Sequence, residues 1–338
     1  MSAVYNHMDP FLSDDDATAM LRLAESLESF GTYADEASSE GLGEKLPQRF
    51  DAALNYAARG IEGTGNTDDF KTATHRTNYF RETYAYGDDV RASGIAPFMQ
   101  QPDLQDLARK VSGREVIVPA IVYANLLIPG QELAVHTDVP EFRGANRKVL
   151  PQWLLVVMLH SGLFDAWRIP IATCVSWFGK AKGGAFTFFP HGPNAQREAI
   201  PAAHNSAIII DTDQVFHGVE RVSQKQIALP PIEKTARLHF MGDDVWQLRD
   251  GDAVLGDYNW SEIRYSISWK AYCFTDAAER DLWAAGADDL SVDFIVTRLE
   301  EALRAQGVLH GDRPEPTAFA RLLVDHFVRF PAIDGAAA

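Results

Sequence analysis

Two short stretches decide the fold: residues 171–178 read IATCVSWF, and residues 207–211 read AIIID. Both are rich in β-branched or aromatic side chains and are bounded by Pro, Gly, Asn or Asp, the pattern of short strands separated by turns. Similar runs occur at residues 116–128, 153–160 and 185–189. We therefore expect a mainly β core between about residue 115 and about residue 275, built as a sandwich or barrel.

The segments on either side of this core carry apolar residues three and four apart, which predicts helices. The expected flanks are residues 1–114 and 276–338, and an insertion is expected at residues 223–260. We expect the core, the two flanks and the insertion to form one elaborated domain. The predicted helices span Ala17–Phe30, Ala277–Ala285, Val292–Ala305 and Thr317–Phe330.

The composition limits the partners of the protein. Of the 338 residues, 46% are hydrophobic, and 47 acidic side chains outnumber 31 basic ones, giving a formal net charge of -16. A globular chain with this charge is a poor partner for nucleic acids and anionic membranes, and no apolar run is long enough to span a bilayer. Two cysteines and no visible secretory signal favour the cytoplasm. The oligomeric state cannot be read from the sequence.

The triplet His136-Thr137-Asp138 has the spacing of a metal-binding pair. Residues two apart on a strand point to the same side, so the imidazole and the carboxylate can converge on one ion. An ordinary polar strand end is the alternative, since chance supplies similar triplets at His7-Met8-Asp9 and His310-Gly311-Asp312.

A further imidazole, that of His217, follows the buried run at residues 207–211. Two histidines and one carboxylate can form a facial triad, which suits Fe(II) and leaves coordination positions open for catalysis. The alternative is a structural core histidine.

The segment RYSISW at residues 264–269 places Arg264, Ser266 and Ser268 on one face of a predicted strand. A buried guanidinium needs a carboxylate partner, because an unpaired buried charge costs several kcal/mol. A dicarboxylate cosubstrate would supply one, and an ion pair within the protein is the alternative.

Taken in order, His136-Thr137-Asp138, the stretch GGAFTFFP at residues 183–190, His217-Gly218-Val219 and Arg264-Tyr265-Ser266 resemble the Fe(II)- and 2-oxoglutarate-dependent dioxygenases, in their prolyl-hydroxylase-like branch. The resemblance covers about residues 115–275. It implies a double-stranded β-helix, a cupin-like jelly-roll, with Fe(II), 2-oxoglutarate and O2 as cofactor and cosubstrates. By this resemblance His136, Asp138 and His217 would hold the iron, while Arg264, assisted by Ser266, would bind the distal carboxylate of 2-oxoglutarate.

Two departures from the family pattern leave alternatives open. The family places its arginine close behind the distal histidine, so Arg237 is a rival to Arg264. A tyrosine that relatives often carry before the Pro-Gly turn is Leu127 here. Asn125 would then take over its contact with the cosubstrate, or would be a strand-end amide in water.

The substrate is less defined by the sequence. Trp153, Trp177 and Phe186 lie on predicted strands near the metal and line either the pocket or the core. Residues 75–81 read HRTNYFR, so Arg76 and Arg81 either grip an anionic or amino-acid-like group or lie on a solvated helix face.

We therefore expect an enzyme that hydroxylates an unactivated C–H bond of a small molecule, an amino acid or a natural-product intermediate, while 2-oxoglutarate is decarboxylated to succinate. The alternatives are a hydroxylase of peptidyl residues, as in prolyl hydroxylation, and a non-catalytic jelly-roll binding module. Helical flanks that close the mouth of the barrel would favour the small-molecule enzyme.

Overall fold

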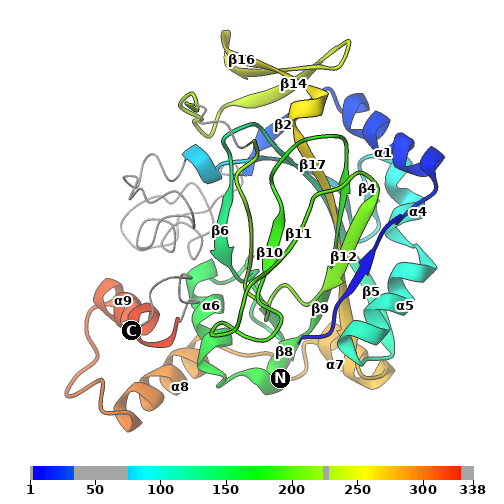
Figure 1. The fold of residues 1–338 in the computed structure, drawn as a ribbon. Helices are drawn as coiled ribbons and strands as arrows, with labels where there is room; N and C mark the ends of the chain where they lie inside the picture. The colour runs from blue at the N-terminus through cyan, green and yellow to red at the C-terminus, as the bar shows by residue number, and fades with distance from the viewer. Residues whose placement is uncertain (1–2, 34–74, 224–227, 329–338) are drawn as a thin grey trace.

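The computed structural model describes residues 3–33, 75–223 and 228–328, and its dominant feature is one large antiparallel sheet (Figure 1). Strand β17 lies near its middle, paired with β5 on one side and with β9 on the other. In spatial order the strands are β1 (Asn6–Met8), β12 (Ser206–Ile210), β9 (Ile171–Phe178), β17 (Arg264–Phe274), β5 (Val116–Leu127), β3 (Phe80–Tyr86), β2 (Ser29–Thr32), β14 (Arg237–Gly242), β15 (Val245–Asp250) and β16 (Ala253–Asn259), with β4 (Asp89–Val90) on β3.

A smaller antiparallel sheet faces the middle of the large one. Its strands are, in order, β11 (Glu198–Ile200), β10 (Phe186–Phe188), β13 (His217–Val219) and β6 (Leu133–His136). Trp177 from β9 and Phe186 from β10 pack together between the two sheets, with ring centroids 6.0 Å apart. A separate short pair is formed by β7 (Glu141–Phe142) and β8 (Arg168–Ile169).

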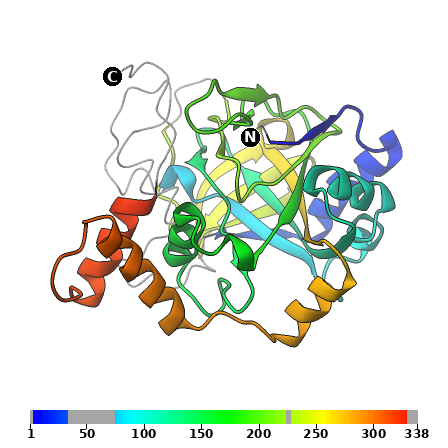
Figure 2. The same cartoon turned by 90° about the horizontal axis from the view of Figure 1, so that it is seen from below.

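Two groups of helices flank the sheets. Helices α1 (Asp14–Ser26), α4 (Ala96–Met99) and α5 (Pro102–Ser112) share the largest apolar cluster with the large sheet. Helices α6 (Gln152–Ser161), α8 (Val292–Ala305) and α9 (Pro316–Phe327) form a second cluster, with α8 and α9 on the side opposite α1 (Figure 2). Helix α7 (Ala277–Ala285) follows β17. No helix in the described part of the chain is long and apolar enough to cross a membrane.

One predicted strand is wrong. The run at residues 153–160 lies on helix α6, which begins after Pro151 and ends at Gly162, a glycine in the left-handed conformation. The helix is buried on most sides against α9 and its neighbours, so its side chains are almost uniformly apolar and show no helical period. A continuous apolar run cannot distinguish a buried helix from a buried strand.

Most other predicted elements are confirmed with shifted ends. Strands β5, β9, β10 and β12 and helices α7 and α8 lie where the sequence indicated. Helix α1 ends at Ser26, so Phe30 lies on β2 instead of on the predicted helix. Helix α9 ends at Phe327, and the last predicted residues, 329 and 330, lie outside the described ranges.

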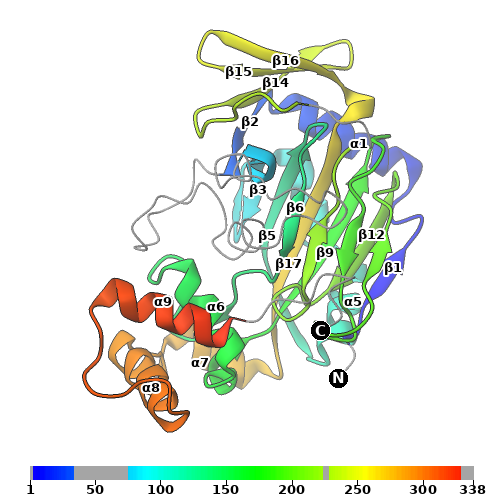
Figure 3. The same ribbon diagram turned by 60° about the vertical axis from the view of Figure 1, so that its left-hand side comes forward.

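The N-terminal flank is less helical than expected, because strands β1 to β4 come from it and join the large sheet. The insertion supplies β14, β15 and β16, which extend the same sheet beyond β2 (Figure 3). Residues 34–74 of this flank lie outside the described ranges.

Candidate metal and cosubstrate site

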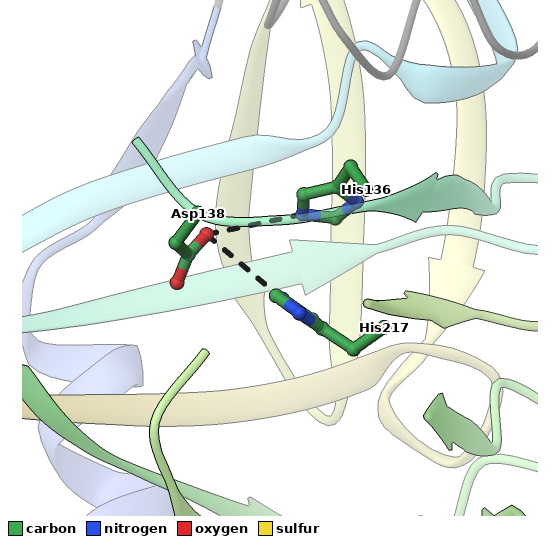
Figure 4. A group of neighbouring side chains, drawn as sticks. All are labelled: His136, Asp138 and His217. Atoms are coloured by element: carbon green, nitrogen blue, oxygen red, sulfur yellow. Dashed lines mark ion pairs between the residues drawn. The ribbon is translucent and has the colours of Figure 1, made fainter. Parts of the chain in front are cut away.

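Three side chains converge between the sheets (Figure 4). His136 ends β6, Asp138 follows two residues later, and His217 begins β13 directly opposite His136. The Nε2 atoms of His136 and His217 lie 3.8 and 3.9 Å from Oδ1 of Asp138, and the imidazole centroids are 4.5 Å apart. One ligand atom from each residue lies within 4.8 Å of the other two. All three side chains are buried, so this arrangement fits one divalent ion.

Both imidazoles are held in the orientation that metal binding needs. Nδ1 of His136 lies 2.6 Å from the carbonyl of Ala134, and Nδ1 of His217 lies 2.9 Å from the carbonyl of Val215. A carbonyl only accepts hydrogen bonds, so each Nδ1 donates its proton and each Nε2 keeps a lone pair. Such outer contacts fix the tautomer and the direction of histidine ligands.

The carboxylate of Asp138 is held just as firmly. Its Oδ2 accepts hydrogen bonds from Thr212 Oγ1 at 2.6 Å and from Lys270 Nζ at 2.7 Å, which leaves Oδ1 facing the imidazoles. Burial alone would lower the pKa of Lys270, but the negative charge of Asp138 raises it above its usual value. Lys270 therefore stays charged and fixes one oxygen of the ligand.

Sequence reasoning missed Lys270 and Thr212. Arg264, Ser266 and Ser268 occupy every second position of β17, and Lys270 is the next residue in this series. The pattern that predicted the first three could therefore also have predicted Lys270. No sequence signal marks Thr212.

The other two His-x-Asp triplets, which begin at His7 and His310, are not part of a metal site. Within the described ranges, His136, Asp138 and His217 are the single group of three or more His, Cys, Asp or Glu residues placed to hold a metal.

Arg264 lies at the start of β17 with 3% of its surface exposed. Its Nε donates to the carbonyl of Gly184 at 2.7 Å, and its Nη1 donates to Ser266 Oγ at 3.3 Å. Burial lowers the pKa of Arg264 to about 9. No Asp or Glu in the described part of the chain pairs with this guanidinium, so the alternative of an internal ion pair is not seen there.

Asn125 and Arg237, the two residues left open by the sequence, lie in different surroundings. Asn125 is directly opposite Ser266 on the neighbouring strand, and its Oδ1 is buried with no hydrogen-bond partner among the described residues. Arg237 on β14 is 42% exposed, pairs with Glu82 at 3.2 Å and contacts Ser29. Asn125 thus offers an unsatisfied acceptor next to Ser266, while Arg237 is already paired.

A cavity of about 810 Å³ opens from these residues. It is lined by the three triad side chains together with Arg264, Ser266 and Asn125. The two imidazoles and the carboxylate therefore fit Fe(II), and the buried guanidinium of Arg264, which has no carboxylate partner among the described residues, fits a dicarboxylate cosubstrate in the same cavity.

Of the five proposed substrate residues, Arg81 alone is among the lining residues. Its guanidinium lies 3.7 Å from the ring centroid of Tyr123. Trp177 and Phe186 are buried between the sheets, where Phe186 stacks on His217 with centroids 5.4 Å apart. Trp153 packs within the helical cluster around α6, and Arg76 is half-buried outside the lining.

No protein-family model matches the chain, and no curated protein matches it. Solved structures similar to this chain include a prolyl-4-hydroxylase from Pseudomonas putida, 10% identical over 80% of this chain and 92% of its own, with a TM-score of 0.40. The non-haem α-ketoglutarate-dependent carbocyclase SnoK from nogalamycin biosynthesis is 9% identical over 80% of this chain and 81% of its own, with a TM-score of 0.42.

HygX from Streptomyces hygroscopicus, solved with nickel, 2-oxoglutarate and hygromycin B bound, is 9% identical over 82% of this chain and 90% of its own, with a TM-score of 0.39. Because these TM-scores are below 0.5, any assignment of chemistry to the site has to be argued from the residues of this chain.

Proposed function

We propose that this protein is an Fe(II)- and 2-oxoglutarate-dependent dioxygenase that hydroxylates an unactivated C–H bond of a small molecule. The observation that carries the proposal is the convergence of His136, Asp138 and His217 on one point of a large cavity. A donor set of two imidazoles and one carboxylate with open positions suits non-haem iron oxygenases. The two facing antiparallel sheets agree with the double-stranded β-helix that the motifs imply.

Two separate groups of residues would bind the metal and the cosubstrate. His136, Asp138 and His217 would hold the iron, and Lys270 and Thr212 keep Asp138 turned so that Oδ1 alone faces the imidazoles. Arg264 and Ser266 would bind the distal carboxylate of 2-oxoglutarate, with Asn125 beside them. When bound, Fe(II) with 2-oxoglutarate and O2 supplies the oxidising chemistry that yields succinate, CO2 and a hydroxylated product.

The walls of the cavity favour a small molecule over a peptide. Besides the core strands, they include Tyr33 from the N-terminal flank and Trp283 and Asp289 from the C-terminal flank. Flanks that contribute to the walls enclose a substrate on more sides than an open peptide groove would.

Succinate formation from 2-oxoglutarate tests the proposal. The purified protein should produce succinate only when Fe(II) and O2 are both present, and His136→Ala and His217→Ala should each abolish this activity. The matched control is His310→Ala, which removes an exposed histidine from one of the chance triplets. Succinate formation that persists in both triad variants would refute the assignment, and its absence from the wild-type protein would favour a binding module.

A further inference from the structure

The cavity is lined by more basic than acidic side chains, although the chain as a whole has more acidic ones. Across the whole chain, 47 acidic residues outnumber 31 basic ones. Among the described lining residues, the basic side chains outnumber the acidic ones by six to three. The basic residues are Arg81, Arg91, Arg147, Lys148, Arg264 and Lys270, and the acidic residues are Asp138, Glu141 and Asp289.

Metal and cosubstrate do not remove this excess. A divalent cation and the dianion 2-oxoglutarate together add no net charge, so the lining keeps its excess of three positive charges when both are bound. Arg264 would be occupied by the cosubstrate, and Lys270 is already paired with Asp138. Of the remaining basic groups, Arg91 is paired with Asp89 at 3.0 Å, and the guanidinium of Arg81 lies over the ring of Tyr123. A positively charged cavity attracts anionic ligands, even in a protein whose overall charge is negative.

Two of these groups, Arg147 and Lys148, follow one another in the loop between β7 and α6. Nζ of Lys148 lies 4.7 Å from the ring centroid of Tyr86. Arg147 forms no ion pair within 4.0 Å among the described residues. The nearest acidic influence is Glu141, whose pKa is raised by burial and lowered in part by both cations, and whose carboxyl accepts a hydrogen bond from Tyr272. The lining residues Tyr86, Arg147 and Lys148 form what we call the Tyr86–Lys148 end of the cavity, after the contact that defines it.

The loop that carries these cations is fixed by its own hydrogen bonds. Phe142 and Ala145 exchange two backbone hydrogen bonds of 2.9 Å, and Asn146 Oδ1 accepts from the backbone N–H of Lys148 at 2.9 Å. Arg143 pairs with Asp288 at 2.9 Å, which ties the loop to the C-terminal flank. These contacts hold the backbone of the loop in place, and the exposed side chains of Arg147 and Lys148 extend from it.

The strand register gives the distance across the sheet from Tyr86 to Lys270. Ile121 on β5 is paired with Lys270 on β17 and with Tyr86 on β3, so the three residues form one row across the sheet. Neighbouring strands are about 4.8 Å apart, which puts Tyr86 about 10 Å across the sheet from Lys270, the residue that contacts Asp138. This span is the length of a small organic molecule.

We propose that the primary substrate carries an anionic group, a carboxylate or a phosphate, which Arg147 and Lys148 bind at the Tyr86–Lys148 end while the carbon to be oxidised lies at the metal. This inference deepens the proposed function and rests on it for the position of the reacting carbon. The anion site itself is defined without the metal.

Binding of matched aromatic probes tests the anion site. The full chain, loaded with Mn(II) and saturating 2-oxoglutarate, is titrated calorimetrically with phenylacetate, phenyl phosphate, neutral phenylacetamide and cationic phenethylamine. At least one anion should bind tenfold or more tightly than the neutral and cationic probes. The ratio between the two anions tells whether a carboxylate or a phosphate is preferred.

Charge reversal then locates the binding. The double variant Arg147→Glu/Lys148→Glu should weaken anion binding by tenfold or more. Lys110→Glu/Lys180→Glu, which makes the same change of charge at exposed positions outside the cavity, should leave it unchanged. No anion binding, equally tight binding of the neutral probe, or unchanged binding in the first double variant would overturn the proposal.

Two further variants separate this inference from the proposed function. In His136→Ala, anion binding should persist even though the metal site is damaged, so a failed oxygenase assignment leaves the anion site measurable. In Arg264→Met, the probes should still bind. Loss of probe binding in Arg264→Met but not in Arg147→Glu/Lys148→Glu would show that the probes occupy the cosubstrate site, and would refute the proposed anion site.

Discussion

Among individual residues, Arg264 is the one whose burial is best explained by the proposed binding of 2-oxoglutarate. Its guanidinium is 3% exposed, and in the described part of the chain it meets a carbonyl and a hydroxyl but no carboxylate. A buried charge without a counter-ion is destabilising, and replacing it with an apolar side chain of similar volume is often neutral or favourable.

Arg264→Met should therefore separate stability from binding. We expect the free energy of unfolding of the ligand-free protein to stay unchanged or rise by up to about 3 kcal/mol, while the affinity for 2-oxoglutarate falls by about 100-fold or more. Urea unfolding and calorimetric titration measure the two quantities. Arg237→Met, which alters an arginine outside the cavity, should leave the affinity unchanged. A large loss of stability in Arg264→Met would mean that the guanidinium serves the fold.

Asp213 gives the ligand-free protein a pH-dependent stability. It is fully buried, neither carboxylate oxygen has a hydrogen-bond partner among the described residues, and Lys270 Nζ lies 4.0 Å away. Burial raises the pKa of Asp213 from 3.8 to about 8. Between these two values the folded protein binds a proton that the unfolded chain has lost, so stability falls as the pH rises through this window.

Asp213→Asn should remove this dependence. The stability of the variant relative to the wild type should increase with pH between about pH 4 and about pH 8, with a slope of at most about 1.4 kcal/mol per pH unit. Urea unfolding of the metal-free proteins at several pH values measures the slope. Parallel stability curves for the two proteins would contradict this account of Asp213.

The four residues with the strongest chemical signatures, His136, Asp138, His217 and Arg264, were predicted from the sequence because residue type, spacing and order carry the signal. The residues that orient them were not. Thr212 is a polar residue of ordinary type whose burial depends on the packing of distant strands, which no local pattern encodes. Lys270 could have been predicted from the alternation along β17, but its contact with Asp138 could not.

Among the elements, the close approach of β13 to β6 sets the distance between the two imidazoles. A Cβ atom on Gly218 would lie 2.8 Å from the carbonyl oxygen of Leu133 on β6, so the glycine allows the strands to approach each other. His217 is the preceding residue, opposite His136.

Gly218→Ala should therefore push β13 away from β6 and weaken metal binding by about tenfold or more, with a smaller effect on secondary structure. Titration with Co(II), followed by absorbance, gives the affinity, and circular dichroism reports the fold. In the control Gly94→Ala, the new Cβ meets only the end of the Leu23 side chain, at 3.1 Å. Equal Co(II) affinity in Gly218→Ala and the wild type would contradict this role for the close strand approach.

The elements also show where sequence patterns stop being informative. Strands with alternating or β-branched residues were predicted correctly, whereas α6 was mistaken for a strand because it is buried on nearly all sides. The insertion at residues 223–260 carried no visible strand signal, although it forms β14 to β16. Those strands are partly exposed at the end of the large sheet, and their pairing with β2 depends on a segment about 200 residues away in the chain.

For the whole molecule, the proposed ligands should stabilise the fold. A ligand that binds only the native state adds about 2.7 kcal/mol to the free energy of unfolding at a concentration of 100 times its Kd. Mn(II) and 2-oxoglutarate at saturating concentrations should therefore raise the Tm of the wild type by several degrees, and removal of the metal with a chelator should reverse the rise. The shift should be absent in His136→Ala. An equal shift in that variant would place the metal elsewhere.

The shape of the cavity is a property of the whole chain. Tyr33, Trp283 and Asp289 reach it from the two flanks, although the predicted catalytic core ended at residue 275. Their place depends on how the flanks pack against the sheets, and the sequence alone gave no sign of it. The basic lining is equally hidden in a chain whose overall charge is -16.

The most direct test of the central claim is the anomalous scattering of iron in crystals grown without oxygen in the presence of Fe(II) and 2-oxoglutarate. The account predicts one peak about 2.2 Å from Nε2 of His136, Nε2 of His217 and Oδ1 of Asp138, with the distal carboxylate of 2-oxoglutarate on Arg264. An empty triad in crystals that contain iron elsewhere, or a peak that lacks any of these three ligands, would contradict it.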